Sequence, residues 1–250
     1  MRRILASLLA VALSGGLSAA YSAQTWVQGT HYFLIQPAQP TSVSAGKVEV
    51  TEVFSYACPA CNHFYPIIDK LKAALPANAE LTFLPAAFNT GEDWPMFQRA
   101  FYTAQALGVD KRTHDAMFDA VWKTGELAII EPGSQRLKSP PPSIEDVAKW
   151  YAKTAGIKAD SFVSTAASFG VDTKTRQADQ YVRAAQVDQT PTMIVNGKYR
   201  VTVGSAGGDE HIIELVLWLV AQESGSAPRA STHKPANDQL PRLAMKARQP

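Results

Sequence analysis

The sequence predicts an α/β fold in which a long helical segment interrupts a small sheet. A strand-like run, residues 47–54, leads directly into a Cys-Pro-Ala-Cys motif that opens a helix. Apolar residues then recur with helical spacing between residues 92 and 186. After this segment, Asn196-Gly197 separates two short apolar runs, which is the pattern of a two-residue β-hairpin turn.

The composition is that of a folded protein without a strong charge bias. Of the 250 residues, 46% are hydrophobic and 18% are charged, and the formal net charge is +2. Such a chain can bury a core, and its balanced charge does not indicate a nucleic-acid-binding protein. No internal repeat is visible, so we expect one or two compact domains.

The first twenty residues have the pattern of an export signal. They combine a basic start, an apolar run over residues 4–13 and small residues before a cleavage site near Ala20. The apolar run is about half as long as a membrane-spanning helix, which needs roughly 20 apolar residues. We therefore expect a signal peptide that is removed on export to an oxidising compartment.

The elements around the cysteine motif alternate between strand and helix. Residues 32–35 and 47–54 are strand-like, and residues 81–85 give a third strand. Between the last two, Pro59 suits the first position of a helix, because the N–H that proline lacks would find no helical acceptor there.

Helical periods fill the next part of the chain, interrupted by a polar loop at residues 131–143. A hairpin over residues 192–203 and a final helix over residues 209–221 follow. The last residues contain few large apolar side chains and cannot order a core. The predicted organisation is a signal peptide (1–20), an α/β domain in two pieces (21–91 and 187–222), a helical insertion domain (92–186) and a disordered tail (223–250).

Cys58 and Cys61 are the two cysteines of the chain. A disulfide that closes so short a loop removes little entropy from the unfolded chain, so the pair does not serve to stabilise the fold. Haem attachment requires a histidine directly after the second cysteine, where this chain has Asn62. A structural metal site needs more ligands than the pair and the nearby His63 supply, and no metal site is expected. Redox chemistry is therefore favoured.

The position of the pair at a helix start predicts different roles for the two sulfurs. A sulfur at a helix N-terminus faces unpaired N–H groups and the positive end of the helix dipole, which stabilise a thiolate. We expect Cys58 to be the exposed, attacking sulfur and Cys61, one turn further along, to be the resolving sulfur.

Glu52 shares a face of its strand with Val48, Val50 and Phe54. A carboxylate on an apolar face is costly unless it is paired or protonated. Two interpretations stay open on the pattern alone. Glu52 is either a perturbed acid beside the reactive pair, or a side chain that reaches the rim of a sheet covered on both faces.

Two motifs, FSYACPAC at residues 54–61 and QTPTMIVNGKY at residues 189–199, together resemble the DsbA family of periplasmic thiol:disulfide oxidases. The resemblance extends over residues 29–221, and the helical segment between the motifs has the length typical of the family. It implies a thioredoxin fold with the helical insertion domain between the third strand and a cis-proline hairpin. It implies no cofactor besides the Cys58–Cys61 disulfide.

The same resemblance assigns roles to further residues. It implies that Glu52 is a buried acid beneath the cysteines, and that a cis peptide bond places Thr190 and Pro191 beside Cys58. Two positions depart from the family pattern: Ala60 replaces the usual histidine, and Thr190 replaces the usual branched apolar residue. The catalytic candidates are Cys58, Cys61 and Glu52, and the residues expected to tune the pair and bind substrate are Pro59, Ala60, Thr190 and Pro191.

The resemblance implies a periplasmic enzyme that donates its disulfide to reduced or unfolded exported polypeptides through a mixed disulfide. A quinone-linked membrane protein similar to DsbB would reoxidise it. A disulfide isomerase or reductase with the same dithiol site is the alternative, and a non-redox binding or chaperone module is a third possibility. Related isomerases carry a dimerisation domain, for which residues 21–29 are too short, so we expect a monomer.

Overall fold

The computed structural model describes residues 25–225, so the predicted signal peptide and residues 226–250 of the predicted tail lie outside the described residues. The described chain contains one mixed sheet with the strand order β1-β5-β4-β2-β3. β2 and β3 are parallel, and the other neighbours are antiparallel. The strands are β1 (Phe33–Leu34), β2 (Val48–Phe54), β3 (Ala79–Pro85), β4 (Thr192–Val195) and β5 (Tyr199–Thr202).

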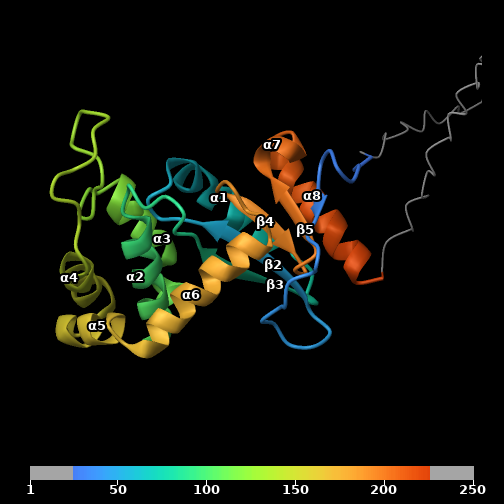
Figure 1. The fold of residues 1–250 in the computed structure, drawn as a ribbon. Coiled ribbons are helices and arrows are strands. Elements are labelled where there is room, and N and C mark those ends of the chain that lie inside the picture. The colour runs from blue at the N-terminus through green and yellow to red at the C-terminus, as the bar shows by residue number, and fades with distance from the viewer. Residues whose placement is uncertain (1–24, 226–250) are drawn as a thin grey trace, which may run out of the picture.

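The helices confirm that a helical insertion separates β3 from β4. Figure 1 shows the insertion gathered at one end of the sheet, with α8 at the other end and α6 returning across the strands. The helices are α1 (Pro59–Ala74), α2 (Trp94–Ala106), α3 (Asp110–Trp122), α4 (Ile144–Ala155), α5 (Ala159–Ala166), α6 (Phe169–Ala184), α7 (Val203–Ala206) and α8 (Asp209–Glu223). Among residues 25–225, none of these helices combines the length and apolar character needed to cross a bilayer.

The central strand β2 is buried along its whole length. On one face, Val50 packs in a cluster with apolar residues of α1 and α8, among them Ile68 and Leu215. On the other face, Val53 belongs to a larger cluster that includes residues of the insertion such as Phe97. Because both faces are covered, β2 provides a rigid base for the cysteine motif that follows it.

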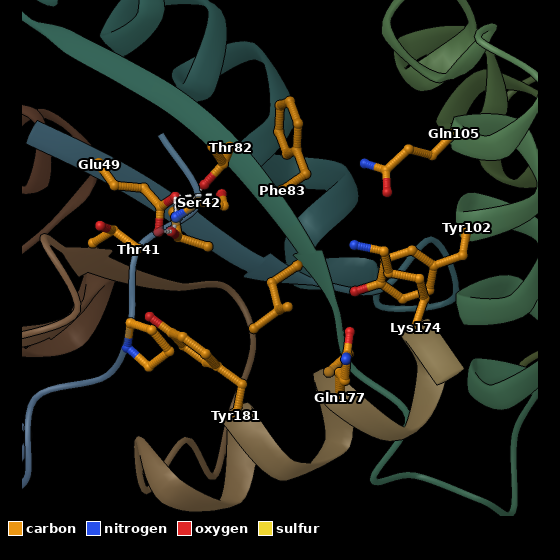
Figure 2. Close-up of a pocket in the computed structure, with 14 residues that line it drawn as sticks. Thr41, Ser42, Glu49, Thr82, Phe83, Tyr102, Gln105, Lys174, Gln177 and Tyr181 are labelled. Atoms are coloured by element: carbon orange, nitrogen blue, oxygen red, sulfur yellow. Dashed lines mark hydrogen bonds between the residues drawn. The ribbon is translucent and has the colours of Figure 1, made fainter. Parts of the chain in front are cut away.

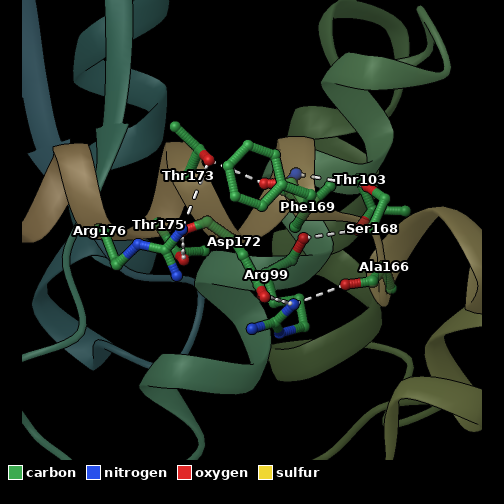
Figure 3. Close-up of polar contacts among 10 residues, drawn as sticks. Arg99, Thr103, Ala166, Ser168, Phe169, Asp172, Thr173, Thr175 and Arg176 are labelled. Carbon is green, nitrogen blue, oxygen red and sulfur yellow. Dashed lines mark hydrogen bonds and ion pairs between the residues drawn. The ribbon is translucent and has the colours of Figure 1, made fainter.

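One arginine joins three helices of the insertion. Arg99 of α2 donates to the carbonyl oxygen of Ala166 at the end of α5 and forms an ion pair with Asp172 in the first turn of α6 at 2.7 Å. Ser168 caps α6 by accepting from the Val171 N–H. Figure 3 shows these contacts side by side. They fix the direction in which α6 leaves the insertion toward the sheet.

The hairpin between β4 and β5 turns at Asn196 and Gly197, as the sequence predicts, and both residues have positive φ. The N-terminal segment crosses this turn closely, since Gln39 donates its backbone N–H to the Gly197 carbonyl at 2.9 Å. A Cβ atom on Gly197 would lie 2.1 Å from the Gln39 carbonyl oxygen. Glycine is therefore required here by both the backbone conformation and the contact.

The end of α8 corrects the predicted boundary of the tail. The helix continues through Glu223, whose carboxylate accepts hydrogen bonds from Lys198 Nζ at 2.5 Å and from the Tyr199 hydroxyl at 3.0 Å. Glu223, which the sequence pattern assigned to the tail, thus belongs to the folded domain. Apolar periodicity could not show this, because polar contacts with the hairpin hold the last turn.

Candidate functional site

The two cysteines lie where β2 gives way to α1. Cys58 is the N-cap residue of α1, with extended backbone dihedrals, and Pro59 occupies the first position of the helix. The Cys61 backbone N–H donates to Cys58 Sγ at 3.4 Å. Both cysteines are free thiols. The predicted helix start at the cysteine motif is confirmed.

Burial corrects one expectation about the pair. Cys58 is only 5% exposed and Cys61 is fully buried, so Cys58 is the more accessible sulfur but is not an exposed residue. The backbone at Thr190 covers it, with Cys58 Sγ 3.6 Å from the Thr190 carbonyl oxygen. The sequence pattern could not show this cover, because Thr190 is far from Cys58 in the chain.

The two sulfurs differ strongly in acidity. Hydrogen bonds from the Cys61 thiol and from the backbone N–H groups of Cys61 and Ala60 lower the pKa of Cys58 to about 6, although burial opposes this. Burial raises the pKa of Cys61 well above its usual value, and the neighbouring Cys58 and Glu52 raise it further. The arrangement therefore favours a thiolate at Cys58 and a thiol at Cys61.

The Thr190–Pro191 peptide bond is cis, as the resemblance implied. This segment and the first turns of α1 border a groove of about 210 Å³ beside the cysteines. His63 and Asp209 also line it and approach one another at 3.1 Å. The groove brings together the candidate residues Ala60, Thr190 and Pro191.

Glu52 lies on the sheet face covered by α1 and is fully buried, so it does not reach the rim. Its two carboxyl oxygens have no hydrogen-bond partner within residues 25–225. Burial raises the pKa of Glu52 well above its usual value, and the nearby Cys58 and Asp115 add to the shift. Burial therefore favours the neutral form of the carboxyl group beside the pair.

Sequence reasoning missed three residues of α3 that contact the loop before Cys58. Trp122 Nε1 donates to the Tyr56 carbonyl oxygen at 2.8 Å, and the Tyr56 hydroxyl lies 2.8 Å from His114 Nδ1. The Phe118 ring packs against the Tyr56 ring. The aromatic residues of α3 stand at helical spacing, which indicated only a core-facing helix.

A second cavity, of about 330 Å³, lies on the opposite face of β2 (Figure 2). Its walls come from the segment before β2, from β2 and β3, and from α2 and α6. Glu49 borders it and accepts hydrogen bonds from the Ser42 N–H at 2.8 Å, the Ser42 hydroxyl at 2.5 Å and the Thr51 hydroxyl at 3.2 Å. None of the candidate redox residues lines this cavity.

Comparisons with known proteins agree with this geometry. The Thioredoxin family model, Thioredoxin_4, matches residues 43–206. The chain is 34% identical to the thiol:disulfide interchange protein DsbA of Pseudomonas aeruginosa over 90% of this chain and 98% of that protein. It is also 34% identical to DsbA of Pseudomonas syringae pv. tomato, over 92% of this chain and 100% of that protein.

Solved structures show the same architecture. The crystal structure of Pseudomonas aeruginosa DsbA has a TM-score of 0.67 at 33% identity, covering 80% of this chain and 96% of that chain. The crystal structure of the oxidoreductase DsbA from Xylella fastidiosa has a TM-score of 0.68 at 33% identity, covering 78% of this chain and 96% of that chain. The fold is thus a thioredoxin fold with a helical insertion, and the chain belongs to the DsbA family of protein thiol:disulfide oxidoreductases.

Proposed function

We propose that this oxidoreductase acts as an oxidant, donating a Cys58–Cys61 disulfide to reduced exported polypeptides. The observation that carries the proposal is the unequal acidity of the two sulfurs, with the pKa of Cys58 lowered to about 6 and that of Cys61 raised. A stabilised Cys58 thiolate favours the reduced form of the pair. Favouring the reduced form makes the disulfide a stronger oxidant.

The exchange proceeds through a mixed disulfide. A client thiolate attacks Cys58 Sγ of the disulfide, a client–Cys58 bond forms, and Cys61 leaves with the electron pair of the broken bond. A second client thiolate then attacks the client sulfur and displaces Cys58 as a thiolate. The client loses two electrons and two protons and gains a disulfide, and the pair is left reduced.

Glu52 relays the proton that this chemistry requires at Cys61. The leaving Cys61 thiolate is buried, and its raised pKa means that it takes up a proton. The protonated carboxyl of Glu52, with no competing hydrogen-bond partner among the described residues, can supply that proton and later take it back during reoxidation.

The groove beside the cysteines accommodates the client. An extended client segment would lie along Thr190 and Pro191, with a side chain in the groove bordered by Ala60. Pro59 and Ala60 separate the two sulfurs and tune the thiolate at the helix start. The site therefore selects clients by an accessible cysteine in an unfolded segment.

The cellular setting follows from the sequence and the family. We propose a periplasmic enzyme that is monomeric, is released by cleavage near Ala20 and is reoxidised by a quinone-linked membrane protein similar to DsbB. It needs no cofactor besides its disulfide. An isomerase or reductase activity is not favoured, because the curated relatives are DsbA proteins.

The division of labour between the sulfurs provides the test. Cys58→Ser should abolish exchange, and Cys61→Ser should accumulate mixed disulfides with clients, because the client bound to Cys58 is then not released by Cys61. Non-reducing gels of the reduced variants incubated with an unfolded protein that carries disulfides measure both outcomes, because the Cys58 thiolate attacks a client disulfide and releases the second client sulfur as a thiolate. Accumulation of mixed disulfides in Cys58→Ser instead would reverse the assignment.

Equilibration of the wild-type protein with glutathione buffers tests the direction of the reaction. We expect the pair to be reduced at a glutathione ratio that leaves ordinary protein disulfides intact. A pair that stays oxidised under these conditions would contradict the proposed role as an oxidant.

A further inference from the structure

Tyr56, two residues before Cys58, is held at three points by a single helix. It is only 2% exposed. Trp122 Nε1 donates to its carbonyl oxygen at 2.8 Å, and its hydroxyl lies 2.8 Å from His114 Nδ1. The ring of Phe118 meets the Tyr56 ring edge to face, with 5.0 Å between the centroids. The backbone, the ring and the hydroxyl of one residue are thus all fixed by α3.

The spacing of these contacts explains why one helix can make all of them. His114, Phe118 and Trp122 follow one another at intervals of four residues, which places them along one face of α3. The same helix also contacts α1, where the Tyr65 ring stacks on Phe118 with centroids 5.4 Å apart. α3 therefore lies against both the loop before Cys58 and the helix that Cys58 opens.

The loop itself is short and fully buried. Within it, the Cys58 N–H donates to the Ser55 carbonyl oxygen at 3.1 Å, and the Ala57 N–H donates to the Ser55 hydroxyl at 3.2 Å. Trp122 adds a hydrogen bond from a residue far along the chain. A shift of the Tyr56 carbonyl would therefore be passed directly to the position of Cys58.

The hydrogen bond between Tyr56 and His114 joins two groups that are both uncharged at neutral pH. Burial lowers the pKa of His114 to about 3, so the imidazole is neutral. Burial also raises the pKa of the Tyr56 hydroxyl well above its usual value. The contact is a hydrogen bond between neutral groups, and it holds the loop without acting as a pH switch.

We propose that α3 of the helical insertion positions Cys58 for thiol–disulfide exchange, with Trp122 and His114 acting through Tyr56 as positioning residues. The proposal rests on the proposed function, because it concerns the thiolate that forms at Cys58. That thiolate depends on a contact whose length is set by the loop, the hydrogen bond that Cys58 Sγ accepts from the Cys61 N–H at 3.4 Å.

Trp122→Phe tests the proposal, because it removes the indole N–H and keeps an aromatic ring. The pKa of Cys58 in the reduced protein is followed by thiolate absorbance against pH, and the glutathione equilibrium constant by trapping free thiols. We expect the pKa of Cys58 to rise by about half a unit or more, and the equilibrium to move about threefold toward the disulfide form. Tyr56→Phe should shift both quantities in the same direction by less.

Trp150→Phe is the matched control. Trp150 is a buried tryptophan of α4 whose indole N–H makes no hydrogen bond within residues 25–225, so its replacement by Phe removes the same atoms away from the loop. The Trp150→Phe substitution should leave the pKa of Cys58 and the glutathione equilibrium unchanged. An equal shift in Trp150→Phe would overturn the proposal, since the effect would then be a general loosening of the insertion.

Two further outcomes separate the proposals. If Trp122→Phe lowers the melting temperature but leaves both redox readouts at the wild-type values, the hydrogen bond is purely structural and only the positioning role is overturned. If Cys58 of the wild-type protein titrates at its ordinary pKa, both the proposed function and the positioning role are overturned.

Discussion

Two glutamates on strand β2 show what separates a structural acid from a reactive one. Glu49 and Glu52 are both buried, at 4% and 0% exposure, and their odd and even positions place them on opposite faces. Glu49 accepts three hydrogen bonds, from Ser42 and Thr51, whereas Glu52 has no partner among the described residues. Burial is common to both glutamates, and at Glu52 no donor offsets the rise in pKa that burial causes.

The same contrast divides the two sulfurs. Hydrogen bonds to Cys58 lower its pKa and stabilise the thiolate. Cys61 and Glu52 are both buried, and their pKa values are both raised. The site therefore combines an anion that is held by donors with two neighbouring groups that are held neutral.

The largest expected effect is the stability difference between Glu49→Leu and Glu52→Leu. Glu49→Leu leaves the donors of Ser42 and Thr51 without their acceptor, and we expect a loss of about 3 kcal/mol in the free energy of unfolding. Glu52→Leu removes a buried carboxyl group that has no partner, so we expect a change within about 1 kcal/mol or a gain. Denaturant unfolding at neutral pH measures both, and equal losses would break the contrast.

The stability of the reduced protein should rise with pH because of Cys58. Between about pH 6, the native pKa, and pH 9, the ordinary pKa, the native thiol has lost its proton and the unfolded thiol still binds one. The contribution of Cys58 to the free energy of unfolding therefore increases with pH across this window, by about 2 kcal/mol after allowance for solvent screening. Unfolding curves at several pH values measure the rise, and Cys58→Ser should remove it.

Glu52 should act in the opposite sense, which provides an internal control. Above its ordinary pKa of 4.5, the unfolded chain loses this proton while the native protein keeps it. Stability therefore falls as the pH rises from that value. Glu52→Gln should abolish this fall while leaving the rise from Cys58 in place, and a variant with an unchanged profile would show that Glu52 is not protonated in the native state.

A smaller effect is expected on the rate of exchange. In the Glu52→Gln variant the glutamine side chain has no acidic proton to give to Cys61. We therefore expect turnover with a reduced client to slow by about tenfold. Glu49→Gln keeps an acceptor for the Ser42 donors on the other face of the strand and should stay within about twofold of the wild-type rate. Stopped-flow measurements of the exchange rate across pH compare the two variants with the wild type. Equal rates in the wild type, Glu52→Gln and Glu49→Gln would leave Glu52 with a structural role only.

The smallest effect concerns Ala60, which contributes only its backbone N–H to the thiolate. Ala60→His adds a cation beside Cys58, lowers the pKa of that thiol and stabilises the reduced form. We expect a shift of about threefold to tenfold in the glutathione equilibrium, or about 15 to 30 mV for a two-electron couple. If both the pKa and the equilibrium stay at the wild-type values, the residue between the cysteines does not tune this protein.

Local patterns predicted the elements that local contacts determine. The strand before the cysteines, the helix start at Pro59 and the Asn196-Gly197 turn all follow from neighbouring residues, and the structure confirms each. The cis bond before Pro191 needed the family resemblance, because no local pattern specifies that isomer. The helical insertion was predictable from its periodicity.

Contacts between distant segments account for what the pattern missed. Strand alternation singled out Glu52 but gave no reason to consider Glu49, which is buried because the segment at Ser42 and helix α6 cover its face. The hydrogen bond from Trp122 to Tyr56 joins residues 66 positions apart, and spacing within α3 could not reveal its partner. The end of α8 at Glu223 likewise depends on the hairpin.

The strand order has a consequence for the growing chain. β2 and the cysteine motif are made early, but β4 pairs with β2 only after residues 62–191 have also been synthesised. Trp122 and the Thr190 carbonyl, which lie against the loop and against Cys58, also come later in the chain. A nascent or unfolded chain therefore carries two ordinary cysteines, and the acidic thiol arises only with the completed fold.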